Sequence, residues 1–174
     1  FRSDIPYSKT ILAQLGESYR KYRNTCRFVL GNLYDHAPEE HPLASAELTE
    51  LDRYALARLG DVVAEVRRAY AAYEFHSVFR ALLDYISIEL SAFYLDVIKD
   101  RLYCDAAGSP SRRAAQAVLY AIGRALATLA APILCFTAED VWSHLPRRGD
   151  DPASVHLALM PDGARIPDGD PLAA

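Results

Sequence analysis

The sequence predicts an all-α protein, an antiparallel bundle of four long helices followed by a short C-terminal helix. Four stretches carry apolar residues at spacings of three and four, the period of one face of an α-helix. Segments containing proline or glycine separate them, and the two-residue alternation of a β-strand persists nowhere. Long helices joined by short loops pack as antiparallel neighbours, so we expect a bundle. We expect one domain over residues 1–161 and a disordered tail over residues 162–174.

The first two helices are predicted from where their apolar stripes begin and end. The first spans about residues 8–34, with Ser8 as its N-cap. It ends before Pro38 and Pro42, because proline cannot continue a helix. The second spans about residues 46–73, where leucines and valines recur between charged residues.

The third predicted helix, residues 75–103, has the most regular apolar face. Glu89 falls close to that face. Because an isolated buried carboxylate is costly, we expect Glu89 to have a cationic or hydroxyl partner.

The last two helices are predicted from their capping residues. Ser109 is the expected N-cap of the fourth helix and Pro110 its first residue, and Pro132 ends it. The short last helix is predicted to begin after Thr137 as its N-cap, with Asp140 reaching back to the cap.

The composition is that of an ordinary globular protein, and it excludes several classes. The net charge is −4, and no apolar run approaches the ~20 residues of a membrane span. Neither the three cysteines nor the five histidines show a metal-binding spacing. We therefore expect a reduced, cytoplasmic protein whose cysteines are buried as small apolar side chains. The chain does not begin with Met, and we expect it to be part of a longer polypeptide.

The sequence contains no recognisable catalytic motif. The patterns GxGxxG, GxxxxGK[ST], GxSxG and HExxH are all missing. We therefore expect no catalytic residue and no metal ligand in this chain, and we place any active site outside it.

Positive charge concentrates in the first helix, although the chain is acidic overall. Residues 19–27 carry a charge of +4, so the remainder carries −8. Four polar side chains at i, i+3, i+4 and i+7 share one side of that helix: Arg20, Arg23, Asn24 and Arg27. Two interpretations are open, a solvated outer face or a contact with a polyanion such as nucleic acid. The pattern alone favours the solvated face.

Two further pairs of cations need explanation. Lys99 and Arg101 end the third helix, where they either complement the helix dipole or bind an anion. Arg112 and Arg113 lie in the first turn of the fourth helix, where the dipole disfavours positive charge. We expect an anionic partner near them.

Several long phrases resemble one family. They are YRKYRNTCRFVLGNL, LDRYALARL, YEFHSVFRALLDYISIELSAFYLDVIKDRLY and APILCFTAEDVW. In this order they resemble the helical anticodon-binding domain of class I aminoacyl-tRNA synthetases of the Ile/Val/Leu group, and most closely the bacterial isoleucyl-tRNA synthetases. The resemblance covers about residues 8–161. The family's His-Ile-Gly-His and Lys-Met-Ser-Lys-Ser signatures are missing from this chain.

The resemblance implies that tRNA binding and catalysis belong to different domains. This bundle would dock tRNA(Ile), while the catalytic domain of the same polypeptide carries out the ATP-dependent aminoacylation. ATP, magnesium and zinc would be bound only by the parts missing here, so this chain itself needs no cofactor, and we expect a monomer. The resemblance implies that the arginine row of the first helix contacts the tRNA backbone, with Lys99 and Arg101 on or near the same side. Tyr19 and Tyr22 are expected to face the core.

Other functions stay open at this point. A valyl or leucyl relative would share the Pro-Ile and Glu-x-x-Trp skeleton. A helical protein-interaction module would use the same charged face against an acidic protein. A ligand-binding bundle would need an apolar cavity, for which Glu89 is the only hint.

Overall fold

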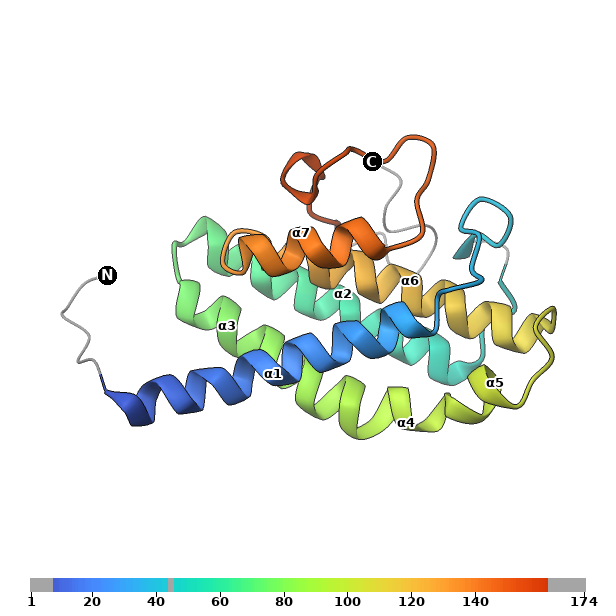
Figure 1. The fold of residues 1–174 in the computed structure, drawn as a ribbon, viewed down its shortest axis with the longest axis horizontal. Helices are drawn as coiled ribbons and strands as arrows, with labels where there is room; N and C mark the ends of the chain where they lie inside the picture. Colours follow the sequence, from blue (N-terminus) through green and yellow to red (C-terminus); the bar gives the residue numbers. More distant parts are fainter. Residues whose placement is uncertain (1–7, 44–45, 163–174) are drawn as a thin grey trace.

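The computed structural model describes residues 8–43 and 46–162, and within them every regular element is a helix. The long helices run back and forth along the long axis of the molecule, so that successive helices are antiparallel, as Figure 1 shows. This confirms the predicted all-α bundle. The long elements and the last helix are α1 (Lys9–Gly31), α2 (Glu50–Ala71), α3 (Phe75–Asp84) with its continuation, α6 (Pro110–Ala130) and α7 (Cys135–His144). Apart from Asp162, the predicted tail lies outside the described residues.

Local capping chemistry sets the starts of the three longest helices, α1, α2 and α6. Ser8 and Ser109 each accept a backbone N–H of the first turn at 3.1 Å, as predicted. Helix α2 begins later than predicted, because Thr49 and Asp52 form a reciprocal capping box there. The prediction of Thr137 as N-cap was wrong: α7 begins at Cys135, and Thr137 lies inside its first turn.

The third stretch is not one regular α-helix. It passes from α3 into a π-helix, η2 (Tyr85–Tyr94), and then through α4 (Leu95–Val97) to α5 (Lys99–Tyr103). A π-helix closes hydrogen bonds from i to i+5, so each turn is wider and the buried face rotates. The apolar spacing predicted a helix here but could not show this change of winding.

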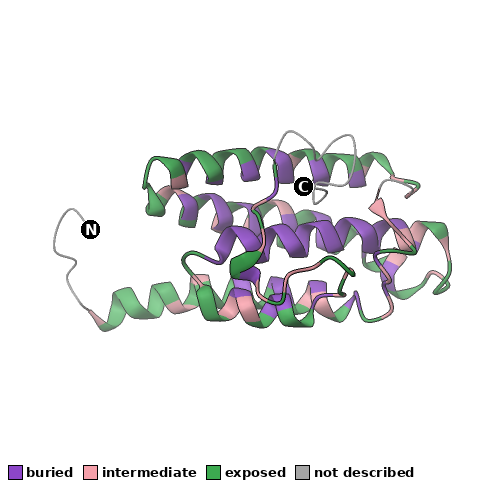
Figure 2. Ribbon diagram, turned by 90° about the horizontal axis from the view of Figure 1, so that it is seen from above, coloured by how far each residue is buried: buried purple, intermediate pink, exposed green. Residues whose placement is uncertain are grey.

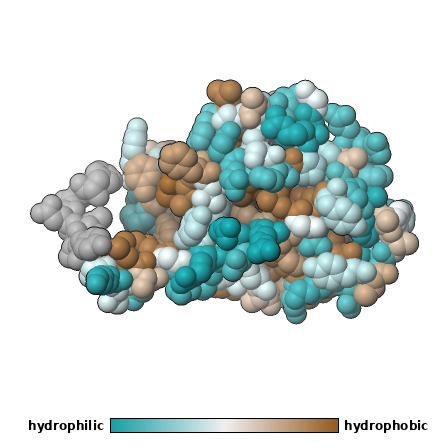
Figure 3. All heavy atoms as spheres, in the orientation of Figure 1, coloured by the Kyte–Doolittle hydropathy of each residue, from teal (hydrophilic) through white to brown (hydrophobic). Residues whose placement is uncertain are grey.

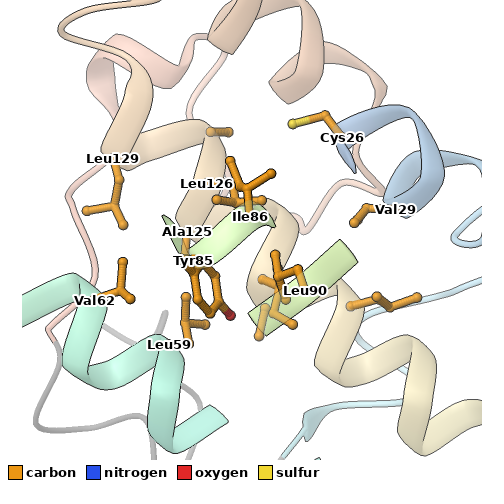
Figure 4. Packing of buried hydrophobic residues seen from close by; sticks show 14 of the residues in the cluster. Cys26, Val29, Leu59, Val62, Tyr85, Ile86, Leu90, Ala125, Leu126 and Leu129 are labelled. Atoms are coloured by element: carbon orange, nitrogen blue, oxygen red, sulfur yellow. The ribbon is translucent and has the colours of Figure 1, made fainter. Parts of the chain in front are cut away.

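Helix α6 is the centre of the core. Nearly every residue along it is buried, whereas its neighbours expose one side, as Figure 2 shows. In Figure 4 its Leu126 and Leu129 lie among side chains from three other elements. Those side chains include Cys26 and Val29 of α1, Leu59 and Val62 of α2, and Ile86 and Leu90 of η2.

Helix α1 belongs to the core only in its second half. Tyr22 and Cys26 are buried there, but Ile11, Leu12 and Leu15 nearer its start are 37–50% exposed. The first turns project past the end of the bundle in Figure 1, and apolar atoms gather over them in Figure 3. The apolar stripe that predicted this helix is therefore buried only in the second half of α1.

Three smaller expectations have mixed outcomes. Glu89 has both predicted kinds of partner, because the Tyr54 hydroxyl donates to it at 3.0 Å and the Arg58 guanidinium lies 3.4 Å from it. Of the three cysteines only Cys26 is buried, so the prediction was wrong for Cys104 and Cys135. No helix within residues 8–43 and 46–162 has the length and apolarity that a membrane crossing requires.

Candidate nucleic-acid interface

The polar row of α1 forms an exposed ridge. Its four members all face solvent: Arg20, Arg23, Asn24 and Arg27. They do so because Tyr22, Cys26 and Val29 bury the opposite side of the same turns. Arg20 pairs with the exposed Glu17 one turn before it. Within the described part of the chain, Arg23 and Arg27 form no salt bridge, so their charge is available to a partner.

On one side of this ridge lies a groove that we call the lysine groove. It encloses about 350 Å³ between α1, η2 and α4. Asn24 and Lys99, which are 75 residues apart in the sequence, both line it. Its lining is Lys21, Asn24, Thr25, Phe28, Ser87, Ser91, Leu95, Asp96 and Lys99. The structure therefore brings together two predicted site residues from different helices.

The lysine groove is lined by both apolar and polar side chains, and Lys21 and Lys99 give it two positive charges. Thr25 and Ser91 share a hydrogen bond of 3.1 Å, and the buried Ser87 hydroxyl has no hydrogen-bond partner among the described residues. The Lys99 ammonium donates to Asp96 at 2.7 Å, which raises the pKa of Lys99. Both side chains of this pair are exposed, so the pair is weak and Lys99 can turn to an anion.

Lys21 and Phe28 complete the lysine groove, and the sequence contained a signal for both. They stand at i and i+7 around Asn24 at i+3, so they share one edge of α1. Lys21 was missed because the prediction followed the row of Arg20, Arg23, Asn24 and Arg27, and Lys21 lies beside that row. Phe28 is half-buried at this edge, where a base could contact its ring.

On the other side of the ridge lies a second groove, which we call the arginine groove. It encloses about 660 Å³ between α1 and α7, and its lining includes Arg23, Arg27, Tyr34, Phe136, Asp140 and His144. Tyr19 and Thr137 share a hydrogen bond of 3.2 Å that joins the two helices. Tyr19 is therefore partly exposed at the groove, whereas it was expected to face the core like Tyr22.

Arg101 was predicted to lie with Lys99 on the side that binds tRNA, but the structure pairs it with a buried carboxylate. Its side chain is only 17% exposed, and its guanidinium holds Asp52 with two hydrogen bonds of 2.9 Å. It also donates to the hydroxyl and the carbonyl of Ser111. These contacts join α5 to α2 and α6, so Arg101 stabilises the bundle and is withdrawn from the interface. Lys99, two residues earlier, stays at the surface.

The expected anionic partner of Arg112 and Arg113 belongs to the chain itself. Arg112 holds Asp35 with hydrogen bonds of 2.6 and 2.9 Å, and Arg113 donates to the Asp35 carbonyl at 2.7 Å. The hydrogen bond from Arg112 is the main reason why the pKa of Asp35 falls to about 2. This cluster fastens the loop after α1 to the start of α6, so it needs no external anion.

The ridge and the two grooves offer side chains that can bind a ligand. In the part of the chain that the structure describes, no group of three or more His, Cys, Asp and Glu side chains could hold a metal ion. The exposed cations offer hydrogen bonds and charge to phosphate oxygens. The arrangement is that of a helical binding domain with a basic ridge.

Comparison with known proteins places this domain in a family. Residues 52–171 match the family model described as the anticodon-binding domain of tRNA ligase. The chain belongs to this family. The match begins within α2, so the ridge of α1 lies outside it.

The individual proteins that the chain resembles are isoleucine–tRNA ligases. The isoleucine–tRNA ligase of Desulforudis audaxviator is 53% identical over 162 residues, which are 93% of this chain and 17% of that protein. The ligase of Geobacillus kaustophilus is 48% identical over 95% of the chain and 18% of that protein. The ligase of Bacillus cytotoxicus is 46% identical over 172 residues, 99% of the chain, so that match includes α1. The chain thus spans less than a fifth of the length of these relatives.

Proposed function

We propose that this chain binds tRNA(Ile) as the anticodon-binding domain of an isoleucine–tRNA ligase. The observation that carries the proposal is the basic ridge of α1, with an open groove on each side that both polar and apolar side chains line. Residues of α1 and α4–α5 that the resemblance associates with tRNA, Asn24 and Lys99, meet in the lysine groove. Family membership and the similarity to isoleucine–tRNA ligases support the same function.

The ridge suits contacts with phosphate and ribose. Such contacts set the position of a nucleic acid without reading its sequence. Guanidinium groups stay charged at every relevant pH, and their fork matches the oxygens of a phosphate. We infer that Arg20, Arg23 and Arg27 hold the backbone of the tRNA, and that Asn24 and Lys99 contact it from the lysine groove.

In this proposal the chemistry belongs to the rest of the polypeptide. A catalytic domain of the same chain would bind ATP and magnesium and charge the tRNA, and a zinc module would also lie outside these residues. The domain would work as a monomer in the cytoplasm, where tRNA is charged. The residues described here hold the tRNA in place.

Charge reversal on the ridge tests the proposal. The triple variant Arg20→Glu, Arg23→Glu, Arg27→Glu should bind labelled tRNA(Ile) at least tenfold more weakly at 0.1 M salt. Each lost phosphate contact should reduce the slope of log affinity against log salt by about 0.7 to 0.9. Fluorescence anisotropy over a salt series measures both quantities. Equal affinity and equal slope for the variant and the wild type would refute the proposal.

A matched control reverses the same number of positive charges at arginines outside the ridge. Arg53, Arg68 and Arg80 are exposed on α2 and α3 and line neither groove. Replacing all three with Glu should change binding by less than the ridge variant does, although the net charge is equal. Equal loss in both variants would mean that only the overall charge matters.

Competition distinguishes the alternatives. An anticodon-binding domain of the isoleucyl type should prefer tRNA(Ile) over tRNA(Val) and tRNA(Leu). A protein-interaction module should bind heparin or an acidic protein as well as it binds tRNA, and that result would replace the present proposal.

A further inference from the structure

The lysine groove contains a carboxylate that phosphate binding alone does not explain. Asp96 lines the groove and accepts from the Lys99 ammonium at 2.7 Å. Both side chains are exposed, and an exposed pair of this kind adds little to stability. A carboxylate repels the phosphates that Lys99 attracts, so Asp96 opposes the binding of a ligand that offers phosphate alone. A ligand that also offers a hydrogen-bond donor gains a contact with Asp96.

The positive charges of the lysine groove come from two helices. Lys21 stands on α1 and Lys99 on α5. Within residues 8–43 and 46–162, Lys21 forms no salt bridge, so a phosphate can bind to it directly. In a nucleic acid each phosphate is joined covalently to a sugar. A phosphate held by these lysines therefore brings its sugar into or beside the same groove.

The lysine groove also carries hydroxyl groups that can form further hydrogen bonds. The Ser87 hydroxyl is buried and has no hydrogen-bond partner among the described residues. Ser91, four residues further along η2, shares one hydrogen bond of 3.1 Å with Thr25. A hydroxyl has one donor and two acceptor positions, so both serines can bond to a polar ligand. Together with Asp96 they give the groove a set of acceptors beside its two ammonium groups.

The RNA backbone has a chemical group that suits this arrangement. Each ribose carries a 2′-hydroxyl, which can donate as well as accept a hydrogen bond, and DNA lacks it. This hydroxyl is what allows a protein to distinguish RNA from DNA at a given position. A carboxylate next to a phosphate-binding lysine therefore matches the backbone of RNA better than that of DNA.

We propose that the lysine groove binds one ribose–phosphate unit of the RNA backbone and that Asp96 accepts a hydrogen bond from the ribose 2′-hydroxyl. Lys21 and Lys99 hold the adjoining phosphate, and Ser87 offers its hydroxyl to the same sugar. Asp96 is then a residue that determines specificity, because it repels the backbone of DNA and finds a donor only in RNA. This inference rests on the proposed function and adds the group by which the chain selects RNA among polyanions.

Fluorinated tRNA tests the contact with the sugar. Fluorine in place of the 2′-hydroxyl removes the donor but keeps the sugar pucker of RNA. Two transcripts of tRNA(Ile), one with 2′-fluoro pyrimidines and one with 2′-fluoro purines, together cover every ribose. For one of them, the loss of affinity caused by fluorine should be about fivefold larger in the wild type than in Asp96→Ala, because only the wild type has the charged acceptor to lose. Fluorescence anisotropy measures all four affinities for each transcript.

The matched control is Asp61→Ala. Asp61 is exposed and pairs with Arg58 at 2.6 Å, three residues away, but it lines neither groove. Both substitutions remove one negative charge, so overall charge affects the two variants equally. Only Asp96→Ala should reduce the loss caused by fluorine, and only Asp96→Ala should lower the ratio of affinities for tRNA(Ile) and a DNA duplex. Thermal unfolding should be nearly the same for both variants, because both carboxylates are exposed.

The outcomes separate this inference from the proposed function. If fluorine weakens binding equally in the wild type, Asp96→Ala and Asp61→Ala, the contact between Asp96 and the ribose is overturned while binding by the ridge still stands. If the wild-type chain shows no salt-dependent binding of tRNA at all, the proposed function fails, and this inference fails with it. A loss caused by fluorine that shrinks in Asp96→Ala alone supports the contact.

Discussion

Arg101 and Asp52 form a two-pronged ion pair that joins the end of α5 to the first turn of α2, with both N–O distances at 2.9 Å. Asp52 is completely buried, and it also accepts from Thr49 and from the Tyr94 hydroxyl. Burial raises the pKa of Asp52. The hydrogen bonds from Arg101, Thr49 and Tyr94 together lower this pKa by more than burial raises it, so the net shift is downward. One carboxylate thus caps a helix and fixes two others to it.

Replacing Asp52 with Asn should therefore be severely destabilising. Breaking a buried pair by removing one partner costs about 3–5 kcal/mol, because the remaining charge is left without compensation. Urea unfolding followed by circular dichroism measures the loss. Asp61→Asn, which removes an exposed pair with Arg58, should cost less than about 1 kcal/mol. Similar losses for both variants would contradict the role given to Asp52.

Lys99 and Arg101 should respond in opposite ways to truncation. Lys99→Ala removes an exposed cation from the lysine groove, so it should weaken tRNA binding several-fold with almost no change in stability. Arg101→Ala breaks the pair with Asp52, so it should lower the free energy of unfolding by several kcal/mol. Binding and urea unfolding measured on both variants test the distinction. A folded, stable Arg101→Ala protein that has lost tRNA affinity would return Arg101 to the interface.

Some of these features could be predicted from the sequence alone and others could not. Ser109 and Pro110 predicted the start of α6 correctly, because capping is local chemistry within four residues. The outward direction of Arg23 and Arg27 also followed from helical period. Whether Arg101 meets water or Asp52 depends on which helix packs against α5, and no local pattern contains that. For the same reason the exposure of Phe136 became visible only with α7 in place.

Asp35 should make stability depend on pH in the acid range. Mainly through the hydrogen bond from Arg112, the pKa of Asp35 falls from 3.8 to about 2 in the folded chain. The folded state then binds fewer protons than the unfolded state between these values. The contribution of Asp35 to the free energy of unfolding, about 2 kcal/mol, is nearly complete above pH ~4 and is lost as the pH falls toward 2.

The variant Asp35→Asn tests that dependence. It should be less stable than the wild type at pH 6, and the difference should narrow as the pH is lowered from about 4 to 2. Urea unfolding at a series of pH values measures it. Asp96→Asn, at an exposed carboxylate, should show a much smaller difference throughout. A constant gap between Asp35→Asn and the wild type over this range would mean that the pair with Arg112 does not lower the pKa of Asp35.

Two glycines inside helices should respond to alanine with opposite signs. A Cβ at Gly123 of α6 would lie 3.0 Å from Val29 Cγ1 and 3.1 Å from Leu145 Cδ2, which is tighter than ordinary contact. A Cβ at Gly16 of α1 would meet nothing within 4 Å. Alanine improves a helix by about 0.5–1 kcal/mol over glycine at either position. Crowding in a packed core costs about 1–3 kcal/mol, so it outweighs this gain at Gly123 only.

We therefore expect Gly16→Ala to raise the free energy of unfolding and Gly123→Ala to lower it, by up to about 2 kcal/mol. Urea unfolding at neutral pH measures both changes under identical conditions. Each variant is the control for the other, because the chemical change and its effect on helix propensity are the same. If Gly123→Ala were as stabilising as Gly16→Ala, α1 and the residue after α7 could not approach α6 as closely as the structure shows, and the core around Val29 would be looser than described.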